Sequence, residues 1–203
     1  MSAPQDLAVV VPIKSFRTAK GRLAEVLSME ARAALARRCA ETVLRAAQPL
    51  AVFVVCDDDE VATWATNHGA RTVTPPEPGL NQAVNAGRTA VTGAGFTKLL
   101  VVHSDLPNAG PLAPLGDAPG TVTLVPDRHG DGTNALVVPV DSPFVFRYGP
   151  GSFAAHQAEA IAQGLVLRVV RRDDLALDLD TVDDLRDAGI TVPGAGIATP
   201  PQK

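Results

Sequence analysis

Short apolar runs alternate with amphipathic segments along the first half of the chain. The run Leu7–Pro12 is continuously apolar, as is typical of a parallel strand that is covered on both faces. Similar runs predict strands over residues 51–56, 70–74 and 97–103. The segments between them predict helices over residues 28–47, 57–69 and 80–93. Strand and helix thus alternate with short joins, which indicates a mainly parallel sheet with right-handed crossovers.

Residues that favour a helix start support the helix predicted over residues 28–47. Ser28 is a suitable N-cap, and Glu30 falls in the first turn, where a negative charge is favourable. Leu35, Cys39 and Val43 then recur at helical spacing. We therefore expect one face of this helix to pack on the sheet.

The order of predicted strands and helices is different in the second half of the chain. Strands are expected over 120–127, 134–140 and 165–170, and helices over 152–163 and from about Thr181. These strands should extend the sheet in mixed or antiparallel order. The segment 191–203 is small and rich in proline, so we expect a disordered tail after a domain of residues 1–190. The predicted fold is a single α/β domain with a mixed, mainly parallel sheet.

Composition and missing motifs exclude several functions. The net charge of −4 argues against a nucleic-acid partner, and no apolar run is long enough to predict a membrane span. The glycine fingerprints of dinucleotide-binding and P-loop proteins are missing, as are zinc spacings. Cys39 and Cys56 are expected to be buried free thiols, in keeping with a cytoplasmic protein.

A basic loop follows the first predicted strand. Lys14, Arg17, Lys20 and Arg22 lie within nine residues. Ligands of such sheets bind beyond the carboxyl ends of the strands, where grouped cations can neutralise phosphate oxygens. The alternative is a solvated basic loop without a ligand.

Two other parts of the chain carry candidate acidic ligands. Asp105 follows the fourth strand, and a carboxylate there is a natural Mg²⁺ ligand, although a turn-forming or capping aspartate is the alternative. Asp178 and Asp180 alternate with leucines, so they would share one face of an extended segment. Thr181 can cap the helix that follows. The sequence leaves open whether Asp178 or Asp180 is the second metal ligand.

Two glycine-bearing loops are candidate anion sites. Thr133 follows two glycines between two strands, and Gly149, Gly151 and Ser152 stand at the start of a predicted helix. Helix-start amides bind anions, and glycine allows a close approach of the backbone. The alternatives are an ordinary hairpin loop and an ordinary capped helix.

Together these motifs resemble one family across nearly the whole chain. The motifs, in order, are VPIKSFRTAKGRLA, GLNQAVNAG, VVHSDLP, DGTNAL, YGPGSFAAH and LDLDTVDDL. They are similar to the guanylyltransferases of coenzyme F-420 biosynthesis. The resemblance implies the three-layer fold of nucleotide-diphospho-sugar transferases (the GT-A kind), which sugar and molybdenum-cofactor nucleotidyltransferases share.

The resemblance also implies roles for individual residues. Asp105 and Asp180 would hold Mg²⁺, while Lys14, Lys20 and Arg22 would stabilise charge on the phosphates. The acceptor acid would be bound by Thr133, Gly149 and Ser152. The guanine would meet Gly79, Leu80 and Asn81.

The implied reaction transfers GMP from GTP to a phosphorylated three-carbon acid and releases pyrophosphate. The acceptor would be phosphoenolpyruvate or 2-phospho-L-lactate, and the sequence does not decide between them. Two other readings stay open at this stage. One is a GT-A glycosyltransferase or another nucleotidyltransferase of sugars or molybdopterin, and the other is a GTP-binding domain without catalysis.

Overall fold

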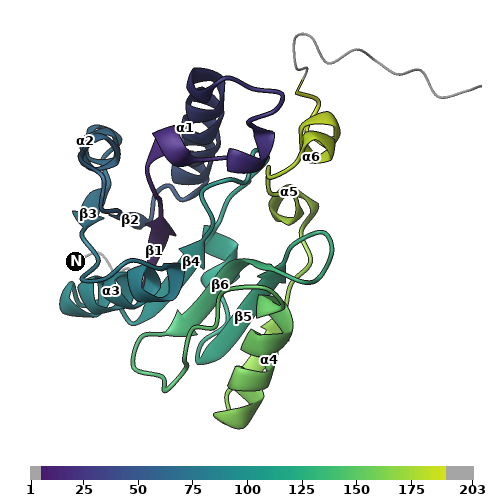
Figure 1. Cartoon of the computed structure of the whole chain (residues 1–203). Helices are drawn as coiled ribbons and strands as arrows, with labels where there is room; N and C mark the ends of the chain where they lie inside the picture. Colours follow the sequence, from purple (N-terminus) through teal and green to yellow (C-terminus); the bar gives the residue numbers. More distant parts are fainter. Residues whose placement is uncertain (1–5, 191–203) are drawn as a thin grey trace, which may run out of the picture.

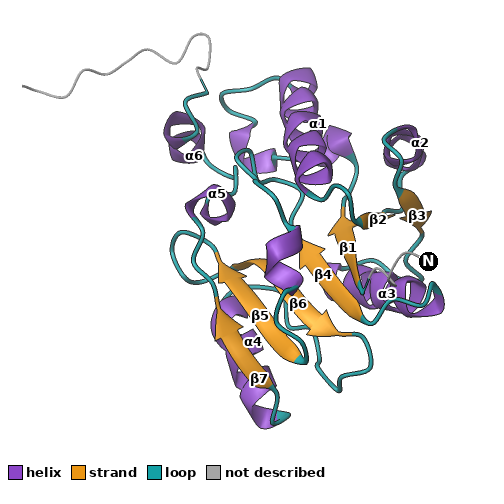
Figure 2. Ribbon diagram, turned by 180° about the vertical axis from the view of Figure 1, so that it is seen from behind, coloured by secondary structure: helices purple, strands orange, loops and turns teal. Residues whose placement is uncertain are grey.

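The computed structural model describes residues 6–190, which fold around one seven-stranded sheet. Figures 1 and 2 show the sheet with helices on both faces, which makes three layers. The strand order is β3-β2-β1-β4-β6-β5-β7. This arrangement confirms the predicted α/β fold, while the predicted tail of residues 191–203 lies outside the described residues.

The elements fall close to the predicted segments. The strands are β1 (Leu7–Pro12), β2 (Ala51–Val55), β3 (Arg71–Val73), β4 (Lys98–Val102), β5 (Thr121–Pro126), β6 (Thr133–Pro139) and β7 (Val166–Val169). The α-helices are α1 (Met29–Ala46), α2 (Asp59–Asn67), α3 (Leu80–Gly93), α4 (Ser152–Ala162), α5 (Asp173–Ala176) and α6 (Val182–Asp187). Three 3₁₀ turns complete the described elements: η1 (Phe16–Thr18), η2 (Gly21–Leu23) and η3 (Ala113–Gly116).

The sheet changes direction in its second half. Strands β3, β2, β1 and β4 are mutually parallel, whereas β6 is antiparallel to both β4 and β5. A short loop turns the chain from β5 into β6, and the Asp127 carboxylate holds it by accepting from the backbone N–H groups of Asp131 and Gly132 at 3.0 and 2.8 Å. Strand β7 is parallel to β5 and forms the edge.

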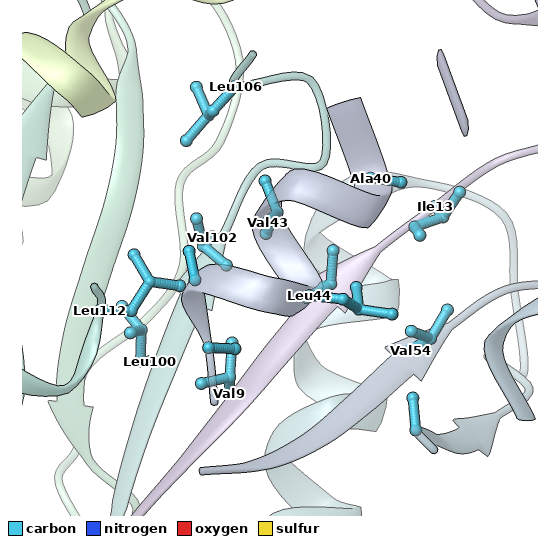
Figure 3. Close-up of a cluster of buried hydrophobic side chains, with 14 of the residues drawn as sticks. Val9, Ile13, Ala40, Val43, Leu44, Val54, Leu100, Val102, Leu106 and Leu112 are labelled. Carbon is cyan, nitrogen blue, oxygen red and sulfur yellow. The ribbon is translucent and has the colours of Figure 1, made fainter. Parts of the chain in front are cut away.

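Alternate residues of the strands point to opposite faces of the sheet and belong to two separate hydrophobic cores. Val9, Leu100 and Val102 face the layer of α1 and α2, where Val43 and Leu44 of α1 meet them (Figure 3). Their strand neighbours face the opposite layer, which contains α3 and α4. This two-sided burial is why the strands read as continuous apolar runs.

The predicted helix caps are present. The Ser28 hydroxyl accepts from the N–H of Ala31 at 3.2 Å, and Thr181 forms a capping box with Asp184. The four-residue helix α5 was not predicted, because so short an element has no apolar period to read. The Leu177–Asp180 segment lies outside the sheet, yet its leucines are buried and its aspartates are partly exposed.

A third, smaller core joins this segment to the first half of the chain. Leu177, Leu179 and Leu185 pack with Leu23 of η2 and with Leu35 of α1. Both views place α5 and α6 on the side of the molecule that carries the loop after β1 (Figures 1 and 2). Residues about 150 positions apart are thus brought to one edge of the sheet.

No helix of residues 6–190 is both long and apolar enough to cross a lipid bilayer.

Helix α3 lies close against the sheet at Gly87. A Cβ atom there would lie 2.6 Å from Cγ1 of Val10 and 3.2 Å from Cγ2 of Val55. We predict that Gly87→Ala lowers the free energy of unfolding by up to about 2 kcal/mol, because overpacking typically costs about 1–3 kcal/mol. The gain of about 1 kcal/mol that alanine brings to a helix offsets part of that cost. Urea denaturation measures the difference.

Gly93 provides the matched control, because a Cβ atom at this last residue of α3 would meet nothing within 4 Å. Gly93→Ala should leave stability unchanged or raise it. Equal stability of the two variants would contradict the close contact between α3 and β1.

Candidate active site

A cavity of about 770 Å³ opens at the carboxyl edge of the parallel strands. The loop after β1 and the ends of β2 and β4 form its floor. The start of α3 and the segment 178–180 form its walls. Its polar and charged lining consists of Lys14, Ser15, Thr18, Lys20, Asp57, His103, Ser104, Asp105, Asp178 and Asp180. The cavity lies where parallel α/β sheets bind ligands.

The basic loop is folded into two 3₁₀ turns that aim Lys20 inward. Phe16 in η1 is buried and packs edge-on against Trp64 of α2, with ring centroids 5.1 Å apart. Lys20 joins the two turns with φ 57°, in the left-handed region that lysine seldom adopts. The backbone reversal buries the Lys20 side chain, which is only 6% exposed.

Lys20 bridges two of the predicted carboxylates. Its Nζ lies 2.7 Å from Oδ2 of Asp105 and 3.3 Å from Oδ1 of Asp180. A guanidinium nitrogen of the exposed Arg22 lies 3.4 Å from the other Asp180 oxygen. The structure therefore brings together Lys20, Arg22, Asp105 and Asp180 from three distant parts of the chain.

This cluster shifts the pKa values of its members. Burial opposes charge on Lys20, but the ion pairs with Asp105 and then Asp180 outweigh it, so the pKa of Lys20 is raised. Burial likewise opposes ionisation of Asp105, and the Lys20 charge overcomes it, so the pKa of Asp105 is lowered. Both groups are therefore charged at neutral pH.

Asp178 differs from Asp180. Burial, followed by the nearby Asp105 charge, raises the pKa of Asp178. Both aspartates line the cavity, but the described ion pairs of Lys20 and Arg22 reach Asp180 and not Asp178. Asp180 is thus the carboxylate that the structure couples to Asp105.

Backbone and side-chain contacts fix Asp180 opposite Asp105. The N–H of Leu179 donates to the carbonyl of Asp105 at 3.2 Å. The buried Asp184 carboxylate accepts from the N–H of Asp180 at 2.8 Å and from that of Thr181 at 2.6 Å. Arg128, in the β5–β6 loop, pairs with the other oxygen of Asp184. The backbone of Asp180 and of its neighbours is therefore held by hydrogen bonds, and this fixes where the Asp180 carboxylate lies.

The carboxylate pair fits a divalent cation that is completed by substrate. Oδ1 of Asp105 is buried and accepts no hydrogen bond from the described residues, and such an atom calls for a partner. Within residues 6–190, no three His, Cys, Asp or Glu side chains are arranged to hold a metal ion. Mg²⁺ commonly takes one or two carboxylates with phosphates and water, so two suffice.

The predicted nucleotide segment is divided between two roles. Gly79 and Leu80 line the cavity, together with Pro75, Pro78 and Ala83. Asn81 does not line it: the Asn81 amide accepts from the N–H of Tyr148 at 2.8 Å and donates to the Tyr148 carbonyl at 3.0 Å. The side chain of Asn81 therefore fixes the start of α3 to the loop before α4.

The predicted acceptor residues lie at the same end of the sheet but outside the cavity lining. The side chains of Thr133 and Ser152 are buried, and the Thr133 hydroxyl lies 3.0 Å from Nδ1 of His156. Nε2 of His156 accepts from the N–H of Arg147, and burial lowers the pKa of His156 to about 4, so the ring is neutral and Nδ1 donates to Thr133. The roles of Thr133, Gly149 and Ser152 toward an acceptor stay predictions.

Three of the amides at the start of α4, those of Gly151, Ser152 and Phe153, are already bonded within the protein, contrary to the expectation that they are free. The N–H of Gly151 donates to the Asp131 carboxylate at 3.1 Å, and the N–H of Phe153 donates to the Asp131 carbonyl at 2.9 Å. The N–H of Ser152 donates to the Gly149 carbonyl at 3.1 Å. The Asp131 carboxylate of the β5–β6 loop thus lies at the helix start, where the sequence pattern predicted a bound anion.

Sequence reasoning missed several residues at the site. Asp57, His103 and Ser104 line the cavity, and Asp184 and Arg128 hold Asp180 in place. Asp57 directly follows a predicted strand and His103 is the last residue of another, so their position at the binding edge was a usable signal. The contact between Arg128 and Asp184 spans 56 positions and has no sequence signal.

The chain is similar to known proteins over most of its length. The family model described as "Guanylyl transferase CofC like" matches residues 7–199. A phosphoenolpyruvate guanylyltransferase of Sphaerobacter thermophilus is 38% identical over 186 residues, covering 88% of this chain and 90% of that protein. One of Rubrobacter xylanophilus is 37% identical over 185 residues, covering 87% and 90%.

Solved structures show the same fold. A putative nucleotide-diphospho-sugar transferase from Desulfovibrio desulfuricans G20 has a TM-score of 0.73 at 15% identity, over 94% of this chain and 89% of that one. A CMP:2-keto-3-deoxy-manno-octonic acid synthetase complexed with CTP has a TM-score of 0.60 at 11% identity, over 91% and 97%. From the family match and the relatives, we conclude that the chain belongs to the CofC-like guanylyl transferase family and is a nucleotidyltransferase.

Proposed function

We propose that this chain transfers GMP from GTP to the phosphate of phosphoenolpyruvate as a cytoplasmic enzyme of coenzyme F-420 biosynthesis. An oxygen of the acceptor phosphate attacks the α-phosphorus of GTP. The bond from that phosphorus to the α,β-bridging oxygen breaks, and pyrophosphate leaves with the electron pair. The product joins the two substrates through a new diphosphate.

The observation that carries the proposal is the ion cluster of Lys20, Asp105 and Asp180 on the cavity wall. Phosphoryl transfer depends mainly on positioning and on charge stabilisation, and this cluster supplies both. The choice of phosphoenolpyruvate over 2-phospho-L-lactate is supported by the names of the relatives. Phosphoenolpyruvate has a planar carbon–carbon double bond where 2-phospho-L-lactate has a tetrahedral carbon that carries a methyl group.

Asp105 and Asp180 are the residues that would hold Mg²⁺, with Asp178 beside them. Bound Mg²⁺ would reduce the negative charge on the phosphate oxygens. Lys20 keeps the two carboxylates together and adds a positive charge at the same place. Lys14 on the cavity wall and Arg22 at its rim bring further positive charge toward the triphosphate.

No protein nucleophile is needed, because a phosphate monoester has its second pKa near 6 and is largely ionised at neutral pH. The work of the protein is therefore to hold two anionic substrates in line. Gly79 and Leu80 offer the base an apolar wall, and the loops that carry Thr133, Gly149 and Ser152 are proposed to hold the acceptor acid.

The first prediction tests the reaction itself. The purified chain, supplied with GTP, Mg²⁺ and phosphoenolpyruvate, should release pyrophosphate and form a guanylylated product. 2-Phospho-L-lactate and 3-phosphoglycerate serve as matched acceptors. Release of a nucleoside diphosphate would indicate a glycosyltransferase instead, and GTP binding without turnover would contradict an enzymatic role.

The second prediction concerns Asp105. Asp105→Asn should reduce kcat by about 10²–10³, because removing one preorganised charge-stabilising group typically has that effect. The variant should also bind Mn²⁺ more weakly, which electron paramagnetic resonance measures directly. The control is Asp183→Asn, an exposed aspartate of α6 that pairs with Arg186. Turnover by Asp105→Asn that matches the control would refute the metal assignment.

The third prediction concerns the acceptor loops. Thr133→Val removes the hydroxyl partner of His156, and Ser152→Ala removes a second hydroxyl, 3.4 Å from that of Thr133. Both should raise the KM for the acceptor acid and leave the KM for GTP nearly unchanged, because Gly79 and Leu80 line the cavity and these two residues do not. Steady-state kinetics with each substrate varied in turn measures the two constants.

Thr123→Val is the control for the third prediction. The Thr123 hydroxyl is buried without a hydrogen-bond partner among the described residues, so its loss should change neither constant. If Thr133→Val raises the KM for GTP and leaves the KM for the acceptor unchanged, these loops bind the nucleotide and the proposed acceptor role is wrong.

A further inference from the structure

Part of the cavity lining is apolar. This part includes Ile13, Val55, Pro78, Leu80 and Ala83, whose side chains suit the faces of a planar base. The edge of such a base carries polar groups, which need a polar partner in the cavity. The Asn81 amide is already paired with the backbone of Tyr148.

Asp57 also lines the cavity, two positions along the chain from Val55 of the apolar part. It comes two residues after β2, just as Asp105 comes shortly after β4. The register pairs Val55 with Pro12 and Val101 with Val10, so the two aspartates extend beyond the sheet to similar heights. Strand β1 lies between their strands, so two strand spacings, roughly 10 Å, separate them across the sheet. A ribose has to bridge such a gap between an α-phosphate and its base.

The acids beside Asp57 in the sequence are already engaged. Asp58 caps α2 by accepting from the N–H of Val61 at 3.0 Å, and Glu60 forms ion pairs with Arg17 and Arg37. Asp57 itself is exposed and forms no hydrogen bond or ion pair with any side chain or backbone group of residues 6–190. Its backbone is nevertheless fixed, because the preceding Cys56 donates its N–H to the Val73 carbonyl at 3.0 Å. A carboxylate held in a cavity without a partner is available to a ligand.

We propose that Asp57 selects guanine by accepting hydrogen bonds from its N1–H and N2–H₂ groups. An ionised carboxylate offers two acceptor oxygens and no donor. Guanine presents two adjacent donors on this edge, whereas adenine presents one donor beside an acceptor nitrogen. Asp57 would therefore pair fully with GTP and face a repulsive contact with ATP. This assignment rests on the proposed function and names the group that sets its nucleotide preference.

The experiment changes both the residue and the base. Asn at this position offers one acceptor and one donor, which matches xanthine, whose N1–H lies beside a carbonyl oxygen at C2. Wild-type enzyme and Asp57→Asn are assayed for pyrophosphate release with GTP, XTP, ITP and ATP at saturating phosphoenolpyruvate. Wild type should prefer GTP over XTP and should use ITP less well, because inosine lacks the N2 donor.

In Asp57→Asn, kcat/KM for GTP should fall by about 100-fold or more, because a hydrogen-bonding site left mispaired discriminates strongly. The same constant for XTP should rise, so that the GTP/XTP ratio reverses. This ratio compares two substrates on one protein sample, so a partly unfolded variant does not affect it. The control is Asp59→Asn, an exposed neighbour in α2 that is outside the cavity lining, and its ratio should equal that of wild type.

Each outcome decides the matter. A GTP/XTP ratio in Asp57→Asn that equals the wild-type ratio would overturn the assignment, and so would an equal loss with all four nucleotides. If wild-type enzyme releases no pyrophosphate from GTP with any of the acceptors, the proposed function fails before Asp57 is tested. If wild-type enzyme uses GTP, and the GTP/XTP ratio of kcat/KM is the same in wild type and in Asp57→Asn, the proposed function stands and Asp57 has no part in the choice of base.

Discussion

The site depends on one buried ammonium group held between two carboxylates. Lys20 has an uncommon left-handed backbone because that conformation turns its Nζ toward Asp105 and Asp180. Without the ammonium, two like charges would face each other at the end of the sheet, and one of them would have to be protonated or moved. With it, three segments that are distant in the sequence are drawn to one edge.

The pattern of the chain predicted most of the fold, because each strand that is buried on both faces leaves an uninterrupted apolar run. Ser28 and Thr181 were also readable as caps, since capping depends on residues only three positions apart. The bases and acids of the site were predicted as a group, because each follows the carboxyl end of a strand or ends an acidic segment. The pairing of Lys20 with Asp180 spans 160 positions, and only the folded chain reveals it.

Two groups that the sequence offers for ligand binding have partners inside the protein. The Asn81 amide is paired with Tyr148, and the amides of Gly151 and Phe153 at the start of α4 donate to Asp131. A local pattern states what a group can bind and not what competes for it. Asp57 is the opposite case, since its neighbours Asp58 and Glu60 have partners and Asp57 is left for the cavity.

The reversal of strand direction between β4 and β6 has a consequence for how such enzymes diversify. On the proposed assignments, the base contacts come from the parallel half of the sheet, through the ends of β1 and β2 and the start of α3. The acceptor contacts come from the antiparallel half, through the β5–β6 loop and α4, and Asp105 stands at the boundary. Changes in one half that leave the Asn81–Tyr148 and Arg128–Asp184 contacts intact can therefore alter one substrate while the surface that holds the other is kept. A lineage could acquire a new acceptor acid while it keeps the same nucleotide and the same reaction.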